Sequence, residues 1–153
     1  MRPEEFETLI SNTFEARGLA PNSNHVCHVE GNSIYACALG AGLIGLGVLD
    51  PDKLRSQGAV YEALTAYAGE ATTKCVVEQA RSAVVKATDL DIALVAGIEE
   101  GFYGAPEDDQ PVQWPWNLEF ASTPLFADGR AIGACLRERH HPTHEEQPGP
   151  KRT

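Results

Sequence analysis

The chain has 153 residues, of which 42% are hydrophobic and 22% are charged, and its formal net charge at pH 7 is −10. This length is typical of one globular domain with a single core, and the composition excludes a disordered chain. The negative charge disfavours binding to nucleic-acid phosphates and to anionic membranes, and it favours a basic protein partner.

The first third of the chain predicts a helix, a hairpin and a second, buried helix. Apolar residues at helical spacing predict a helix over residues 3–17, which Gly18 ends. Residues 25–36 predict a short β-hairpin with a glycine turn at 30–32. The uncharged, small-residue run 37–47 predicts a buried helix, since a membrane span needs about 20 apolar residues and a basic flank.

The rest of the chain predicts further helices. Asp50-Pro51 has the sequence of a helix cap followed by a first-turn proline. Helical spacing then predicts helices over 58–68 and 70–86, a helix over 90–100 that is capped by Thr88-Asp89 and ended by Gly101, and a last helix that begins at Asp128-Gly129. By composition, residues 103–113 form a loop, and residues 117–120 fit a short strand.

The expected fold class is therefore mainly α, with α+β character from the one short β-hairpin. We expect a compact helical domain of about five helices over residues 1–139, followed by a charged, His- and Pro-rich tail over 140–153. The first residues carry no apolar signal core, so we expect a cytoplasmic protein with reduced thiols.

Residues 40–45 match the G-x-G-x-x-G pattern of dinucleotide-binding folds. Pro51 follows the third glycine too closely for a crossover helix, and the pattern predicts no second strand after it. We therefore interpret these glycines as a small-residue helix face that packs closely against another element, and we expect no cofactor.

Cysteine and histidine gather in the predicted hairpin. The weak candidate ligands of a zinc ion are His25, Cys27, Cys37 and Cys75. The sequence has no C-x-x-C motif, and free cysteine is commonly a small core residue. We therefore expect Cys27 and Cys37 to be buried thiols without a metal.

Charged and aromatic residues of the C-terminal half are candidates for contact with a partner protein or a second copy. Acidic side chains near the end of a predicted helix oppose the helix dipole, and the Trp-Pro-Trp segment splays two large rings. The candidate contact residues are Glu99, Glu100, Glu107, Asp108, Asp109, Trp114, Trp116, Arg137 and Arg139. Residues 137–153 hold too little apolar surface to fold on themselves, so we expect them to lie along another chain.

Two segments carry a resemblance. The stretch Gly31–Ala41, which ends in Cys-Ala-Leu-Gly-Ala, and the later glycine–aromatic segment Ile98–Gly104 resemble parts of small bacterial proteins of uncharacterised function. The resemblance implies a bacterial or phage origin and a helical domain, and it implies no activity.

Together these features favour a non-enzymatic protein-interaction module, an accessory subunit of a larger bacterial or phage assembly. Two alternatives stay open. One is a small zinc-binding protein that uses the hairpin cysteines and histidines, and the other is a small enzyme whose site is assembled from residues far apart in the sequence.

Overall fold

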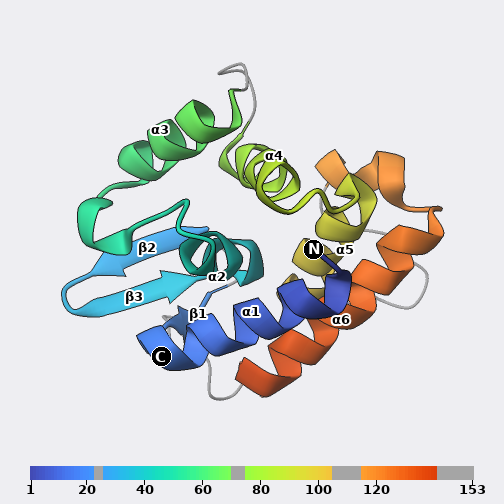
Figure 1. Cartoon of the computed structure of the whole chain (residues 1–153), viewed down its shortest axis with the longest axis horizontal. Helices are drawn as coiled ribbons and strands as arrows, with labels where there is room; N and C mark the ends of the chain where they lie inside the picture. The colour runs from blue at the N-terminus through green and yellow to red at the C-terminus, as the bar shows by residue number, and fades with distance from the viewer. Residues whose placement is uncertain (23–25, 70–74, 105–114, 141–153) are drawn as a thin grey trace.

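The computed structural model describes residues 1–22, 26–69, 75–104 and 115–140. In this part of the chain the helices are α1 (Pro3–Arg17), α2 (Ala38–Gly45), η1 (Pro51–Lys53), α3 (Gln57–Ala68), α4 (Val76–Thr88), α5 (Ile92–Tyr103), η2 (Pro115–Phe120) and α6 (Pro124–His140), where η marks a 3₁₀ helix. The strands are β1 (Ala20–Pro21), β2 (Cys27–Glu30) and β3 (Ser33–Ala36). The expected mainly α fold is confirmed, with six α-helices among the described residues in place of about five (Figure 1).

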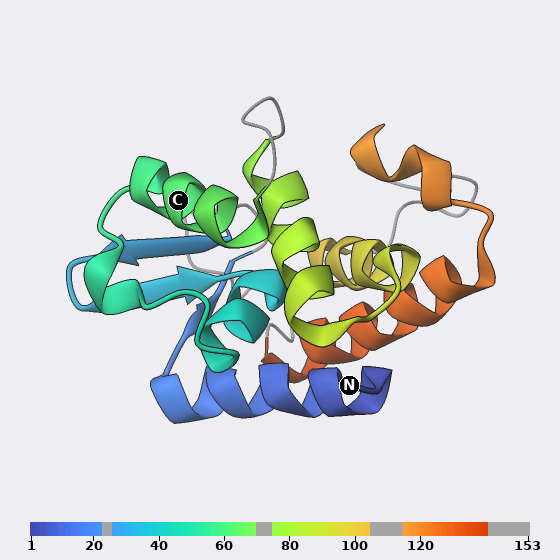
Figure 2. The ribbon, with the colours of Figure 1, turned by 45° about the horizontal axis from the view of Figure 1, so that its top comes forward.

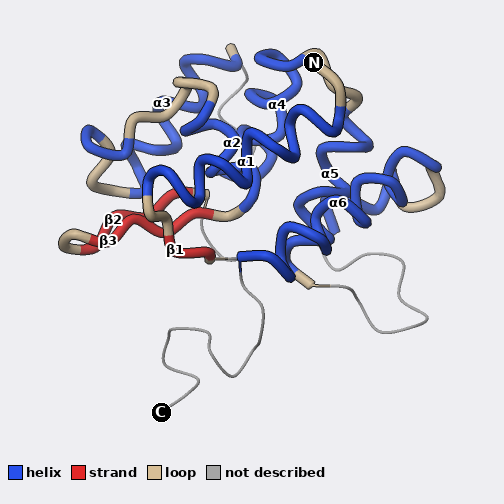
Figure 3. The backbone as a smooth tube through the Cα atoms, turned by 60° about the horizontal axis from the view of Figure 1, so that its bottom comes forward, coloured by secondary structure: helices blue, strands red, loops and turns tan. Residues whose placement is uncertain are grey.

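The predicted hairpin is present at one end of the molecule, away from α5 and α6 (Figure 3). Strands β2 and β3 pair antiparallel, with Cys27 opposite Ala36, and Gly31 takes the left-handed conformation that the turn requires (φ +62°). The strand β1, which no pattern predicted, pairs parallel with β3 and gives the sheet order β1-β3-β2. Two residues are too few to show a period in the sequence.

One hydrophobic core joins the helices. It lies between the six α-helices, and its largest fully buried aliphatic and aromatic side chains include Phe6, Ile10, Leu39, Leu43, Leu64, Leu94, Ile98, Phe102 and Leu136. The apolar stripe of each helix, predicted from spacing, points into this core because its burial removes apolar surface from water. No helix of the described ranges is both long enough and apolar enough to cross a membrane.

Helix α2 is buried over Ala38–Ile44, as the small-residue run predicted. A Cβ atom added to Gly42 would lie 2.6 Å from the Phe6 ring of α1, and one added to Gly45 would collide with the Thr13 hydroxyl of α1. The glycines of the G-x-G-x-x-G pattern thus lie inside a helix that approaches α1 closely, rather than in a loop that could cradle a phosphate.

We expect the variants Gly42→Val and Gly45→Val to lower the free energy of unfolding by about 1–3 kcal/mol or more each, because both overpack this contact. Urea unfolding measures the change. The control is Gly58→Val in α3, where an added Cβ meets no atom closer than 3.9 Å. If all three variants unfold alike, valine in a helix and not the α1–α2 contact accounts for the loss.

Helices α5 and α6 pack even more closely through glycines four residues apart on each helix: Gly97 and Gly101 on α5, and Gly129 and Gly133 on α6. A Cβ at Gly97 would lie 2.9 Å from the backbone nitrogen of Arg130, and one at Gly129 would lie 3.0 Å from the Cα of Gly97. Since later residues of α5 meet later residues of α6, the two helices run in the same direction.

This packing corrects two predicted helix boundaries. Gly101 does not end α5, which continues to Tyr103, and Asp128-Gly129 does not begin α6, which starts at Pro124. A glycine in a sequence signals either a helix end or a site of close backbone approach, and here the partner helix selects the second role.

The predicted cap of α5, Thr88-Asp89, precedes the observed cap, Asp91, by two to three residues. Asp89 takes the left-handed conformation (φ 64°) and ends α4, while the Asp91 carboxylate accepts a hydrogen bond from Ala93 N and begins α5. Aspartate serves both positions because it tolerates positive φ and also makes a good N-cap.

The strand expected over residues 117–120 is a 3₁₀ helix, η2. A strand needs a neighbour that pairs its backbone groups, and the sheet β1-β3-β2 lies at the far end of the molecule (Figure 3). The segment instead turns so that the Asn117 side chain enters the interior, where it is fully buried.

Candidate functional site

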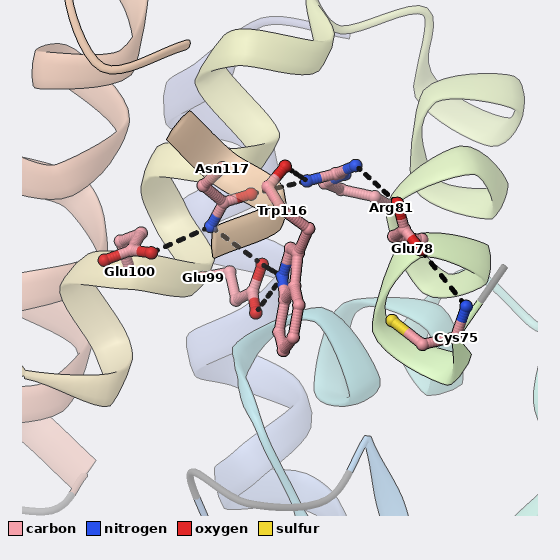
Figure 4. A network of polar contacts seen from close by, with 7 residues as sticks. All are labelled: Cys75, Glu78, Arg81, Glu99, Glu100, Trp116 and Asn117. Carbon is pink, nitrogen blue, oxygen red and sulfur yellow. Dashed lines mark hydrogen bonds and ion pairs between the residues drawn. The ribbon is translucent and has the colours of Figure 1, made fainter. Parts of the chain in front are cut away.

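A buried polar network joins α4, α5 and η2 (Figure 4). Its side chains are those of Glu78, Arg81, Glu99, Glu100, Trp116 and Asn117. Glu100 and Asn117 are fully buried, Arg81 is 4% exposed and Glu99 is 9% exposed. Charged groups so far from water are costly unless they are paired and hydrogen-bonded, so the arrangement is specific rather than incidental.

Asn117 lies at the centre of the network. Its Nδ2 donates hydrogen bonds to Glu99 Oε1 at 3.3 Å and to Glu100 Oε2 at 3.0 Å, and its Oδ1 accepts one from Arg81 Nη1. The carboxamide therefore presents its donor side to two carboxylates and its acceptor side to a guanidinium. Among side chains, only a carboxamide offers two N–H donors together with an acceptor oxygen.

Arg81 holds η2 against α4. Its Nη1 donates to the Trp116 carbonyl oxygen at 3.3 Å, its Nη2 lies 4.0 Å from Glu78 Oε2, and its guanidinium lies 5.3 Å from the centre of the Phe120 ring. The Nε of Arg81 is buried without a hydrogen-bond partner. Glu78 also accepts a bond from Cys75 N at 3.1 Å, which fixes the start of α4.

The carboxyl of Glu99 has a pKa near neutral pH. Burial raises the pKa of its carboxyl to about 7, although the hydrogen bonds from Asn117 and Trp116 and the charge of Arg81 act in the opposite direction. The neighbouring Glu100 carboxylate raises the pKa further. A buried carboxyl that titrates near neutral pH and faces a specific charge partner is a candidate functional group.

Two carboxylates expected at a contact surface are covered in the folded chain. Glu99 and Glu100 lie in the interior, because α5 extends beyond them and η2 covers their face. Trp116 is half-buried and its Nε1 donates to Glu99 Oε2 at 3.3 Å, so its ring covers the interior as well. The candidate contact residues Glu107, Asp108, Asp109 and Trp114 lie outside the described residues.

The two arginines expected to face another chain contact their own chain. Arg137 Nη1 donates to the carbonyl oxygens of Phe102 at 3.0 Å and Tyr103 at 2.8 Å, which caps the C-terminus of α5. Arg139 Nη2 lies 3.6 Å from Glu7 Oε2 of α1. Residues 141–153 of the expected tail lie outside the described part of the chain.

Of the candidate zinc ligands, Cys27 and Cys37 lie near each other, since Cys27 pairs opposite Ala36. Cys27 is buried in the core, Cys37 caps α2 by accepting a bond from Gly40 N at 3.4 Å, and Cys75 is exposed at the start of α4. Burial raises the pKa of the Cys37 thiol to about 12, which disfavours the thiolate that a metal would need. His25 lies outside the described residues, and within them no three His, Cys, Asp or Glu side chains gather as a metal site.

A groove between α1 and α6 is a second candidate site. The two helices lie side by side in Figure 2, and the cavity volume between them is about 290 Å³. It is lined by Pro3, Glu4, Glu7, Leu94, Leu125, Asp128, Ala131 and Ile132. Apolar side chains thus lie beside three carboxylates, and Leu125 is 39% exposed.

Sequence reasoning did not identify Arg81, Asn117 or this groove. A signal for Arg81 exists, since it occupies the apolar stripe of α4 beside Ala80 and Val84, where a charged residue is unusual. Asn117 and the groove offer no such signal, because each depends on elements that are distant in the sequence.

A comparison of the chain with protein-family models, with curated proteins and with solved structures finds no match. The function is therefore argued from the residues of the chain itself.

Proposed function

We propose that the protein is a non-enzymatic interaction module, an accessory subunit whose α1–α6 groove binds a basic, amphipathic segment of a larger protein. The observation that carries the proposal is the pairing of an apolar groove with the carboxylates of Glu4, Glu7 and Asp128 in a chain of net charge −10. The groove of about 290 Å³ lies at the lower end of the range of ligand pockets, about 300–1,000 Å³, and it has room for a side chain or two of a partner.

The groove indicates the chemistry of its partner. An apolar side chain of the partner would pack on Leu94, Leu125 and Ile132, and lysine or arginine side chains one helical turn away would reach Glu4 and Asp128. Glu7 pairs with Arg139 of its own chain at 3.6 Å, so Glu4 and Asp128 are the carboxylates assigned to the partner. Charge complementarity of this kind raises the rate of association and selects against acidic partners.

We expect the double variant Glu4→Gln/Asp128→Asn to bind a basic amphipathic peptide about 2- to 30-fold more weakly than the unchanged protein, because each exposed charge pair contributes roughly 0.2–1 kcal/mol. The probe is a fluorescent helical peptide of leucine and lysine, and its anisotropy is measured at low and high salt. The affinity of the unchanged protein should also fall as the salt concentration rises.

The matched control removes the same charge elsewhere. In Glu62→Gln/Asp52→Asn both carboxylates are exposed and lie in α3 and η1, outside the groove. This control should retain the affinity of the unchanged protein. Equal weakening in both double variants would mean that net charge alone attracts the peptide, and the groove would lose its assigned role.

A further inference from the structure

The segment η2 is fastened to the body of the protein through a few buried side chains. Within Pro115–Phe120 only Asn117 is buried, and Leu118 is 59% exposed. The backbone hydrogen bonds observed at its end are local, from Ala121 N to Leu118 O and from Thr123 N to Phe120 O. The attachment to α4 and α5 runs through Asn117, Trp116 and Arg81 (Figure 4).

These attachments converge on the Glu99 carboxyl, which η2 covers. The charged and titratable groups of the described residues that act on Glu99 come from three elements: Arg81 from α4, Glu100 from α5 and Cys37 from the start of α2. Trp116 and Asn117 of η2 add neutral hydrogen-bond donors. One guanidinium thus serves the carboxyl groups of Glu78, Glu99 and Glu100, and loss of the Glu99 proton adds a buried negative charge to this group.

Thermodynamic linkage gives the direction in which pH acts. With η2 in place, burial raises the pKa of Glu99 to about 7, whereas a Glu99 side chain in water has the reference value of 4.5. The closed arrangement therefore binds the proton more tightly than an arrangement in which η2 has lifted and water reaches Glu99. The closed form is favoured fully below pH 4.5, and the preference is lost as pH rises through about 7.

We propose that η2 is a latch that opens as Glu99 loses its proton, and that opening uncovers an acidic face formed by Glu99 and Glu100. The sequence pattern predicted these two carboxylates on a contact surface. In the closed form Asn117 of the same chain covers them. Opening hydrates both carboxylates and Arg81, while the close α5–α6 glycine contact stays intact, since the atoms nearest to each glycine of that contact belong to the facing helix, α5 or α6.

Hydrogen exchange of the Trp116 indole N–H, followed by NMR, tests the latch. This N–H is bonded to Glu99 in the closed form, so it exchanges only when η2 lifts. After correction for the intrinsic exchange rate, the opening equilibrium should rise about tenfold between pH 6 and pH 8. In the variant Glu99→Gln, whose side chain stays neutral and keeps an acceptor oxygen, this pH dependence should vanish.

Backbone amides of Leu94 and Leu136, both in the core, separate the latch from unfolding of the whole domain. Unfolding of the whole domain also hydrates Glu99, so the test is the level of protection: these core amides should stay far better protected than Trp116 at both pH values. The latch is refuted if Trp116 is equally protected at both pH values, if Trp116 is as strongly protected as the core amides, or if the pH dependence survives in Glu99→Gln.

Discussion

Replacing Gly101 by alanine is expected to lower the free energy of unfolding by about 3 kcal/mol or more. The added methyl group would collide with the backbone carbonyl of Arg130 and would lie 2.9 Å from Ala134 N, so two helix backbones must move apart. Backbone atoms cannot move aside as the end of a flexible side chain can. The loss of stability should therefore be among the largest that overpacking causes. Urea unfolding of the variant measures the loss.

The same substitution at Gly58 in α3 is the matched control. A Cβ there meets only the Ser56 hydroxyl at 3.9 Å, so Gly58→Ala should stabilise the protein by about 0.5–1 kcal/mol through helix propensity alone. Because both changes are glycine to alanine within a helix, their difference isolates the α5–α6 contact. Equal stability of the two variants would show that α5 and α6 do not approach as closely as described.

Replacing Arg81 by methionine is the second change for which we expect a large effect, a loss of about 3–5 kcal/mol. Methionine occupies much of the arginine volume, but the variant removes the only arginine or lysine of the network and leaves Asn117 Oδ1 without its donor. Buried carboxylates are then left uncompensated. Chemical denaturation at pH 7 gives the loss directly.

The exposed arginine at position 17 provides a control, since Arg17→Met should change stability by no more than about 0.5 kcal/mol. At pH 9, where the Glu99 carboxyl is ionised, adding Glu99→Gln to Arg81→Met should recover part of the loss, because one uncompensated carboxylate is then replaced by a neutral amide. A loss below about 1 kcal/mol for Arg81→Met, or no recovery in the double variant, would mean that the network stabilises the fold little.

Local patterns in the sequence were sufficient for the presence of most helices and of the hairpin. The helix that ends at Gly18 and the hairpin that turns at Gly31 are present, and in both places glycine takes a left-handed conformation that side-chain-bearing residues avoid. The cap at Asp50 and the buried run of α2 are present for similar reasons. Such features are readable because each depends on residues within one or two turns of the chain.

Tertiary structure alone decided the role of Gly101 and the surroundings of Glu99 and Glu100. Gly101 has the same chemistry as Gly18, but α6 packs against it and the helix continues. The sequence pattern predicts the two glutamates at the solvent-facing end of a helix. In the structure, Asn117 donates hydrogen bonds to both carboxylates from a position 17 residues after Glu100, and both side chains are buried. Their burial, and with it the raised pKa of Glu99, depends on which distant segment packs there, and no local period encodes that choice.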